Sequence, residues 1–212
     1  MMTKYEWRKQ DKRLYLPKAV PTPIQVPAFN YYTITGHGDP NDLEFGERTG
    51  ALYQAAYGIR MNPKAGVAPV GYYDYTVFPL EGLWTLDPDD VRADGSFDKA
   101  DLRYKLMLRQ PDFVTPTVAQ ENLVRVQEKK ANPLLNEVKF ETLTDGDCLQ
   151  ILHVGSYDDE PATFQQLAVY AAERQWKRRT LAHKEIYLSD PRRTVAAKRK
   201  TVLRWLMTPL KA

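Results

Sequence analysis

A short segment near the C-terminus places a carboxylate between other polar side chains. Residues 183–187 read HKEIY, and because side chains alternate between the two faces of a strand, His183, Glu185 and Tyr187 share one face. Two environments for Glu185 fit this pattern. If its face is open to water, Glu185 is an ordinary surface carboxylate. If both faces are covered, its charge is buried and needs a cation, a hydrogen-bond donor or a proton, and the segment becomes part of a site.

Aromatic residues supply further candidates. The chain has 13 Tyr and 4 Trp against 7 Phe, a bias toward rings with a polar group that suit a partly wet cavity or an interface. Trp84 follows Gly82, a glycine that indicates a bulge or a close backbone approach. Phe113 lies in a turn, and Tyr73 and Tyr75 alternate with polar residues. Each of these rings is also compatible with a place in the core.

Several kinds of chemistry lack the residues they require. There is no phosphate-binding glycine loop, no dinucleotide fingerprint and no G-x-S-x-G motif. Cys148 is the single cysteine, and His37, His153 and His183 do not have metal-ligand spacing. Cys148 lies in an apolar strand pattern, which favours a buried structural thiol. We therefore expect no metal and no cofactor.

Composition indicates a folded domain and argues against several classes of partner. The chain has 212 residues, 43% hydrophobic and 27% charged, with a net charge of +3, which is weaker than the basic stripe expected of a nucleic-acid-binding protein. A protein–protein adaptor such as a gyrase inhibitor would need a strongly acidic surface, and the net charge of +3 argues against it. No apolar run approaches the roughly 18 residues of a membrane helix, and no signal-peptide core is present. We expect a cytoplasmic protein with no membrane or direct nucleic-acid partner.

An internal repeat organises the chain. Residues 29–57 align without gaps onto residues 148–176, and each copy reads as an apolar strand, a Gly and Asp turn and an amphipathic helix. Strand-like sequence follows each helix, at 71–86 in the first half and at 183–188 and 201–209 in the second. Between the halves, 103–109 predicts a strand and 115–130 a helix, with Thr115 as its cap. These elements predict an α+β fold of two strand-helix-strand-strand modules with mostly antiparallel sheet.

Five motifs, taken in order, resemble a known family. They are Gly36–Asn41 (GHGDPN), Pro79–Trp84 (PLEGLW), Arg109–Thr115 (RQPDFVT), His153–Asp158 (HVGSYD) and Glu185–Pro191 (EIYLSDP). Together they resemble the GyrI-like small-molecule-binding family, in its free-standing branch without a DNA-binding domain. The resemblance implies one domain over residues 1–212, with module one at about 24–110, a connecting helix at about 115–131 and module two at about 137–209. It also implies a ligand cleft between the modules.

The resemblance further implies an aromatic pocket around a central glutamate, which by motif position is Glu185. A carboxylate among aromatic rings attracts aromatic or cationic compounds by Coulomb and cation–π interactions. Lys184 stands where relatives often carry a second histidine, which leaves the role of that position open. The residues expected to bind ligand are Glu185, Tyr187, Trp84, Tyr73, Tyr75, Phe113, Tyr157 and His153.

Two functions use this same pocket. The first is sequestration or sensing of aromatic and cationic compounds. The alternative, implied by some free-standing relatives, is hydrolysis of cyclopropane-bearing natural products that alkylate DNA. That chemistry needs a carboxylate to activate water and a hydroxyl to stabilise the phenolate that forms as the ring opens. If the protein is an enzyme, we expect Glu185 as the base and Tyr157 or Tyr187, with Tyr73 as a further alternative, as the hydroxyl donor.

Overall fold

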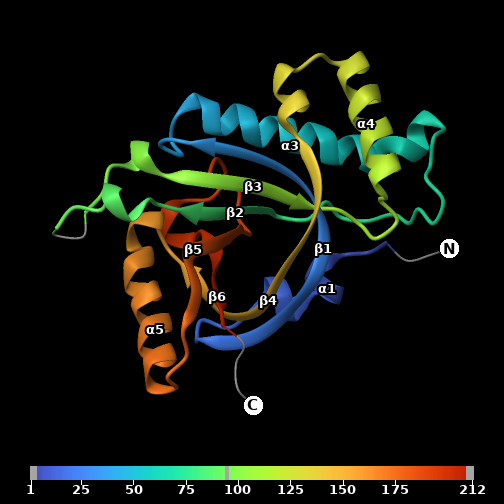
Figure 1. The fold of residues 1–212 in the computed structure, drawn as a ribbon. Helices are drawn as coiled ribbons and strands as arrows, with labels where there is room; N and C mark the ends of the chain where they lie inside the picture. The colour runs from blue at the N-terminus through green and yellow to red at the C-terminus, as the bar shows by residue number, and fades with distance from the viewer. Residues whose placement is uncertain (1–3, 94–95, 209–212) are drawn as a thin grey trace. The chain divides into compact units, whose positions relative to one another are not determined.

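The computed structural model describes residues 4–93 and 96–208. Within these ranges the fold is α+β, with antiparallel strands and helices packed on them (Figure 1), as the sequence predicts. The strands are β1 (Thr22–His37), β2 (Leu80–Thr85), β3 (Arg103–Arg109), β4 (Lys139–Val154), β5 (Arg178–Tyr187) and β6 (Lys200–Met207). The α-helices are α1 (Trp7–Gln10), α2 (Lys12–Tyr15), α3 (Leu43–Met61), α4 (Pro116–Lys129) and α5 (Glu160–Glu173).

The chain divides into two compact units that are each discontinuous in sequence. The first unit comprises Met1–Glu6, Phe29–Phe78 and Leu86–Leu143, and the second comprises Trp7–Ala28, Pro79–Thr85 and Thr144–Ala212. The short strand β2 therefore belongs to the second unit, although the residues on both sides of it belong to the first. Each unit is described by itself.

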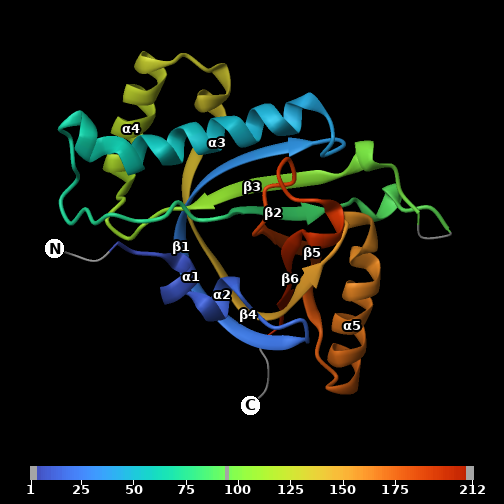
Figure 2. The same ribbon diagram turned by 180° about the vertical axis from the view of Figure 1, so that it is seen from behind.

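The first unit is built on an antiparallel ladder between β1 and β3, which runs from Tyr31↔Arg109 to His37↔Arg103. On one side of the ladder Tyr32 and Ile34 are buried, and α3 and α4 pack together in the same unit (Figure 2). The Tyr32 hydroxyl donates to the Ala119 carbonyl, and the Asn122 amide donates to the Tyr32 hydroxyl and to the Ala55 carbonyl. These hydrogen bonds join β1, α3 and α4 through buried polar groups.

The segment 71–79 differs from its sequence prediction. The alternation of Tyr73, Tyr75 and Val77 predicts a strand that continues to residue 86, but the structure has a strand only over Leu80–Thr85. Upstream there is a single parallel bridge between Tyr5 and Tyr75. The alternating rings pack on other rings instead, because Phe113 lies 5.1 Å from Tyr73 and 6.0 Å from Tyr75 between ring centroids. The side chains of residues 71–79 therefore alternate as in a strand, but these residues pack in an aromatic cluster and form no strand of a sheet.

The second unit is an antiparallel sheet in the order β2-β5-β6-β4. Directly paired residues point to the same face, so the register assigns the faces. One face carries Trp84, His183 and Trp205 in one row, with Gly82, Glu185 and Leu203 in the next. The opposite face carries Leu83, Lys184, Arg204 and Gln150. Glu185 and Lys184 therefore lie on opposite sides of the same sheet.

Helix α5 covers the Glu185 face over β6 and β4, and Figure 1 shows it alongside β5 and β6. Its residues Leu167 and Ala171 share a buried cluster with residues of β4 and β6, namely Leu149, Ile151, Leu203, Trp205 and Met207. Pro161 stands in its first turn with Glu160 before it, a common place for proline because the first helical residues need no amide donor. The helix predicted over 115–130 is present as α4, with the Thr115 hydroxyl accepting from the Val118 amide at 3.2 Å.

The N-terminal segment covers the opposite face. Arg204 donates to the Leu14 carbonyl at 2.7 Å, and Gln150 donates to the Arg13 carbonyl at 2.8 Å. Figure 2 shows α1 and α2 beside β4. Both faces of this sheet are therefore covered. Of the two environments considered for Glu185, the structure has the one in which its face of the strand is covered.

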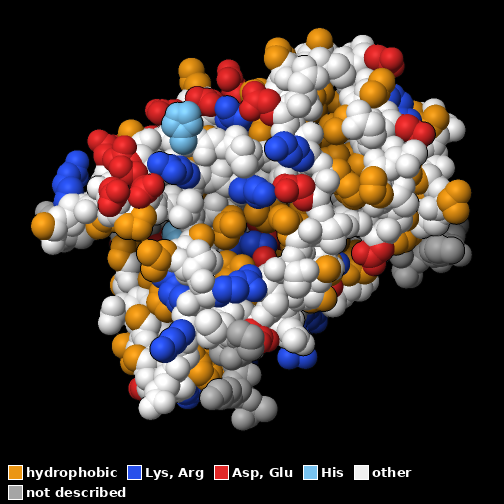
Figure 3. Space-filling view, viewed as in Figure 1, with side chains coloured by type: hydrophobic (Ala, Val, Ile, Leu, Met, Phe, Trp, Pro, Cys, Tyr) orange, Lys and Arg blue, Asp and Glu red, His pale blue; other side chains and the backbone are white. Residues whose placement is uncertain are grey.

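On the molecular face shown in Figure 3, Lys and Arg side chains are interspersed with Asp and Glu. Within the described residues, no helix is both long enough and apolar enough to cross a bilayer.

Candidate functional site

Glu185 lies in the second unit, and its carboxylate is held by hydrogen bonds on both oxygens. His183 Nε2 lies 2.9 Å from Oε1, and the Tyr187 hydroxyl donates to Oε2 at 2.8 Å. The side chain is 12% exposed. The alternation of the strand explains the arrangement, because His183, Glu185 and Tyr187 stand in sequence on one face of β5. Glu185 is thus a largely covered carboxylate that is held by hydrogen-bond donors, and it is not an ordinary surface carboxylate.

A second carboxyl group, Glu160, adjoins Glu185. It is buried at the first position of α5 and shares a side-chain hydrogen bond with Glu185. Burial and then the negative charge of Glu185 raise the pKa of Glu160 to about 9. Glu160 is therefore protonated at neutral pH and donates its proton toward Glu185. Its Oε1 is buried and has no hydrogen-bond partner among the described residues.

Sequence reasoning missed Glu160. Together with Asp158 and Asp159 it reads as the acidic start of a helix, which is a common and ordinary pattern. What distinguishes Glu160 from Asp158 and Asp159 is that the packing of α5 against β5 places it beside Glu185. The local sequence does not predict that packing.

Trp84 and Tyr187 complete a hydrogen-bonded chain. Trp84 Nε1 donates to the Tyr187 hydroxyl at 2.8 Å, and that hydroxyl donates to Glu185. Gly82 lies beneath them, since a Cβ at this position would come within 2.7 Å of Trp84 Nε1 and 3.3 Å of the Tyr187 hydroxyl. The sequence predicts a bulge or a close backbone approach at Gly82, whereas the groups that approach it in the structure are the side chains of Trp84 and Tyr187. Burial, then the charge of Glu185, hold the pKa of Tyr187 well above its usual value.

His153 fixes the start of α5. Its Nδ1 lies 2.8 Å from the Thr163 hydroxyl, and its Nε2 lies 2.9 Å from the Ser156 carbonyl. Since a carbonyl only accepts, Nε2 carries a proton and donates it to Ser156, and in the neutral imidazole Nδ1 then accepts from the Thr163 hydroxyl. Gly155 passes beside this ring with φ +153°, and a Cβ there would lie 3.2 Å from Nε2. Both ring nitrogens are engaged, so in this conformation His153 positions the helix that carries Glu160.

Tyr157 lies at the edge of the cluster. Its half-buried ring packs edge-on against Tyr187, with 6.1 Å between centroids. Arg199 Cζ lies 5.4 Å from the centroid of the Tyr157 ring. Burial raises the pKa of the Tyr157 hydroxyl, although the Arg199 charge acts in the opposite direction.

Three of the predicted ligand residues, Tyr73, Tyr75 and Phe113, belong to the first unit. They form an aromatic cluster there, in which Tyr75 is buried and the other two are half-buried. The structure thus gathers Glu185, Tyr187, Trp84 and Tyr157 in one unit and these three rings in the other. Their shared role in one ligand site stays a prediction.

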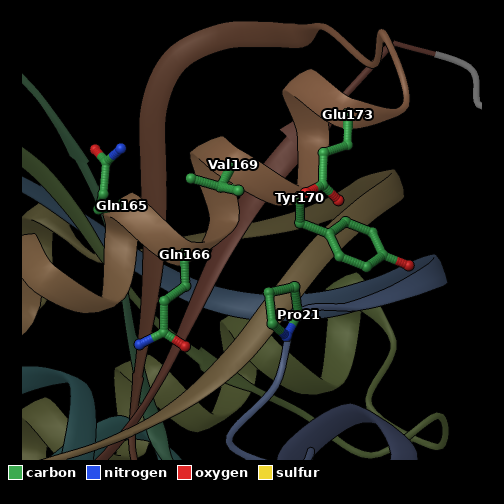
Figure 4. Close-up of a pocket in the computed structure, with 6 residues that line it drawn as sticks. All are labelled: Pro21, Gln165, Gln166, Val169, Tyr170 and Glu173. Carbon is green, nitrogen blue, oxygen red and sulfur yellow. The ribbon is translucent and has the colours of Figure 1, made fainter.

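A separate groove lies on the outer side of α5 (Figure 4). It has a volume of about 310 Å³ and is lined by Pro21, Gln165, Gln166, Val169, Tyr170 and Glu173. None of the ligand-binding or catalytic residues that were predicted from the sequence lines this groove. Among the described residues there is no group of three or more His, Cys, Asp or Glu side chains that could hold a metal ion.

A family model, described as the GyrI-like small molecule binding domain, matches residues 21–205. The chain belongs to the GyrI-like family. A crystal structure of a hydrolase from Listeria innocua is 32% identical, with a TM-score of 0.87, and the match covers 97% of this chain and 100% of that one. An uncharacterized conserved protein from the same organism is 33% identical with a TM-score of 0.88 and the same coverage.

More distant structures share the GyrI-like fold alone. The C-terminal domain of EcmrR is 11% identical with a TM-score of 0.54, and the match covers 92% of this chain and 98% of that one. No curated protein sequence matches the chain. Both the resemblance and the duplicated-module α+β fold predicted from the sequence are confirmed.

Proposed function

We propose that this GyrI-like chain is a hydrolase that adds water to an electrophilic aromatic small molecule, with Glu185 as the base that activates the water. The observation that carries the proposal is the geometry around Glu185, whose two carboxylate oxygens are held by His183 and Tyr187 with the buried carboxyl group of Glu160 beside them. Two neighbouring carboxyl groups held in different protonation states are a recurrent arrangement for acid–base chemistry. A relative of 32% identity over 97% of the chain is described as a hydrolase, which supports the same class.

Glu185 has room for one more hydrogen bond. An ionised carboxylate offers about four lone-pair sites, and His183, Tyr187 and Glu160 occupy three of them. A water molecule on the fourth would donate one proton to Glu185 and keep a lone pair for attack. The unpaired Oε1 of the neighbouring Glu160 offers a second hydrogen-bonding group for the same water or for the substrate.

The substrate class is the one that the family resemblance brings, a cyclopropane fused to a conjugated ring that bears a carbonyl. The water oxygen bonds to the cyclopropane methylene while Glu185 takes the proton. The broken carbon–carbon bond leaves its electron pair in the ring, which becomes aromatic as the carbonyl oxygen becomes a phenolate. A tyrosine hydroxyl, Tyr157 or Tyr187, donates a hydrogen bond to that oxygen. Transfer of the Glu185 proton to the phenolate, through solvent, restores the protein and completes the addition of one water.

Sequestration of lipophilic cations is the competing function. A cation receptor needs a carboxylate whose charge is available to the ligand. Here three donors already share the charge of Glu185, and one of them is the protonated Glu160. The geometry therefore fits the activation of water better than the capture of a cation.

The test is turnover of a spirocyclopropane dienone, followed by mass spectrometry for a gain of one water. Glu185→Gln is expected to lower kcat by about 10²- to 10⁴-fold, the usual contribution of a general base. Glu173→Gln, on the exposed end of α5, is the matched control and should leave kcat unchanged. Absence of hydrated product with the parent protein would contradict the proposal. Tight binding of a rhodamine-type cation that is lost in Glu185→Gln, without any turnover, would favour sequestration instead.

A further inference from the structure

The two tyrosines beside Glu185 differ in what their hydroxyl groups already do. The Tyr187 hydroxyl accepts from Trp84 at 2.8 Å and donates its only proton to Glu185 at 2.8 Å. A phenol has one proton to donate. Tyr187 therefore cannot donate to a substrate oxygen without giving up its bond to the base.

Tyr157 is in the opposite situation. Its hydroxyl has no hydrogen-bond partner within residues 4–93 and 96–208, while its ring is held by edge-on packing against Tyr187. The backbone at this point is fixed, because Tyr157 begins a turn that Ser156 caps. The hydroxyl is thus carried on a defined ring and has its proton available.

Arg199 provides a positive charge next to this ring. Its Nε donates to the Thr194 carbonyl at 3.2 Å and its Nη2 to the Pro191 carbonyl at 3.2 Å, which fixes the guanidinium. The Gly155 amide donates to the Arg199 carbonyl at 3.1 Å, so the backbone of Arg199 is bonded to the turn that carries Tyr157. Arg199 Cζ lies 5.4 Å from the ring centroid, close enough for a Coulomb interaction in a partly buried setting.

We propose that Tyr157 is the hydroxyl that contacts the substrate oxygen as it gains negative charge, and that Arg199 is the positioning residue that supports it. Glu185 and Tyr157 then divide the site into a basic half and an anion-stabilising half. The favoured ligand is a neutral compound whose carbonyl becomes a phenolate on reaction, and permanent cations are disfavoured by Arg199. This inference rests on the proposed hydrolase function and assigns the hydroxyl that the sequence left open.

Turnover gives the first test. Loss of one anion-stabilising donor lowers kcat by about 10²- to 10³-fold, so Tyr157→Phe should show this loss with little change in KM. Its rates should also depend more steeply than those of the parent on electron-withdrawing ring substituents, because the substrate must then stabilise the phenolate alone. Tyr187→Phe should keep the parent's substituent dependence. Unchanged kcat in Tyr157→Phe, or a steeper dependence in Tyr187→Phe only, overturns the assignment.

The second test does not require turnover. With 3-fluorotyrosine at position 157, the hydroxyl can be titrated by fluorine NMR. Glu185 and Asp190 face it with negative charge and Arg199 with positive charge, and Glu160 adds a negative charge only once it loses its proton, at a pKa of about 9. Arg199→Met should raise the pKa of this phenol by about 0.6 to 2.4 units, as expected for one charge across roughly 5 Å at an effective dielectric of 80 to 20. No upward shift overturns the role of Arg199.

Binding of product-like ligands separates this inference from the proposed function. The parent should bind 4-nitrophenolate more tightly than 4-nitroanisole, and both Tyr157→Phe and Arg199→Met should lose that preference. Tyr170 and Arg174 are the matched control, because Arg174 Cζ lies 3.6 Å from the centroid of the Tyr170 ring. Tyr170 is ten residues along α5 from Glu160, which corresponds to a distance of about 15 Å. Tyr170→Phe and Arg174→Met should change nothing. If the parent binds phenolate selectively but hydrates no substrate, the hydrolase proposal fails alone. If it shows no preference, the anion-stabilising site is wrong.

Discussion

Lys184 and Glu185 are consecutive residues of β5 whose charged groups lie on opposite faces of one sheet. Lys184 is 1% exposed, and its Nζ lies 3.1 Å from Glu81 Oε2 and 2.7 Å from Asp145 Oδ2. Arg204 Nη1 adds a contact to Asp145 at 3.3 Å. Burial lowers the pKa of Lys184, but the two carboxylates outweigh that effect and hold the pKa above its usual value. The network ties β2, β5, β6 and β4 together beneath the site.

Lys184→Met should destabilise the protein by about 3 to 5 kcal/mol, because removal of one member leaves buried carboxylates without their cation. Denaturant unfolding measures the change. Adding Glu81→Gln to this variant should recover part of the loss, since it neutralises one of the orphaned charges. Lys198→Met, at an exposed position, is the control. A Lys184→Met protein as stable as the parent would mean that the network does not stabilise the sheet.

The Glu160–Glu185 pair predicts a stability that falls as pH rises. The folded pair keeps a proton up to a pKa of about 9, whereas an unfolded glutamic acid has lost its proton above about pH 4.3. Raising the pH between these values therefore favours the unfolded chain, by at most about 1.4 kcal/mol per pH unit. The contribution is fully present below about pH 4.3 and is lost as the pH rises through about 9.

Glu160→Gln should flatten this dependence, because glutamine has no proton to lose. Unfolding free energies measured from pH 5 to 9 in the parent and in the variant give the comparison, and Glu173→Gln should follow the parent. Parallel curves for the parent and Glu160→Gln would show that Glu160 does not hold the proton.

Gly82→Ala should disturb the site more than the fold. A Cβ at this position lies 2.7 Å from Trp84 Nε1, so the indole must move and its bond to Tyr187 is lost. Overpacking of this kind costs about 1 to 3 kcal/mol, and tryptophan emission should shift as Trp84 changes its environment. Gly46→Ala is the contrasting control, because its Cβ meets nothing within 4 Å and it lies inside α3. That change should stabilise the protein by about 0.5 to 1 kcal/mol. Unaltered emission and turnover in Gly82→Ala would contradict the close packing.

Local patterns in the sequence were sufficient for several elements. The alternation at 183–187 predicts which side chains share a face of β5, and Thr115 with Pro116 predicts the start of α4. Both signals act between neighbouring residues, so they survive without tertiary information. The glycine at position 82 indicated a special place in the strand, but the identity of its neighbours, the side chains of Trp84 and Tyr187, was not predicted.

The rest depends on contacts between distant segments. Glu160 and Lys184 look like surface charges in the sequence. They are buried only because α5 packs on the Glu185 face of the sheet and because Asp145 of β4 pairs with Lys184 on the opposite face. The rings of 71–79 have the period of a strand, yet an aromatic cluster with Phe113 provides the packing instead. The burial of a charge is set by tertiary structure, and no local spacing encodes it.

The discontinuity of the second unit gives a prediction about fragments. Residues 132–212 alone contain β5 and β6 but lack β2 and the segment 7–28. Lys184 then loses Glu81, and Arg204 loses the Leu14 carbonyl. Unpaired buried polar groups of this kind cost more than so small a sheet can compensate. We therefore expect the fragment to be poorly folded, with weak chemical-shift dispersion and no cooperative thermal transition.

Mixing this fragment with residues 1–131 should restore a folded complex, because the missing strand and acceptors are then supplied in trans. The matched control is the full chain with a protease site after residue 131, cut once the protein has folded. The cut keeps every contact of β2 and of segment 7–28, so the nicked protein should unfold cooperatively near the parent's midpoint. Cooperative unfolding of residues 132–212 alone, with that same midpoint, would show that β2 and the N-terminal segment are dispensable. The sheet beneath Glu185 would then not need its contacts with Glu81 and with the Leu14 carbonyl.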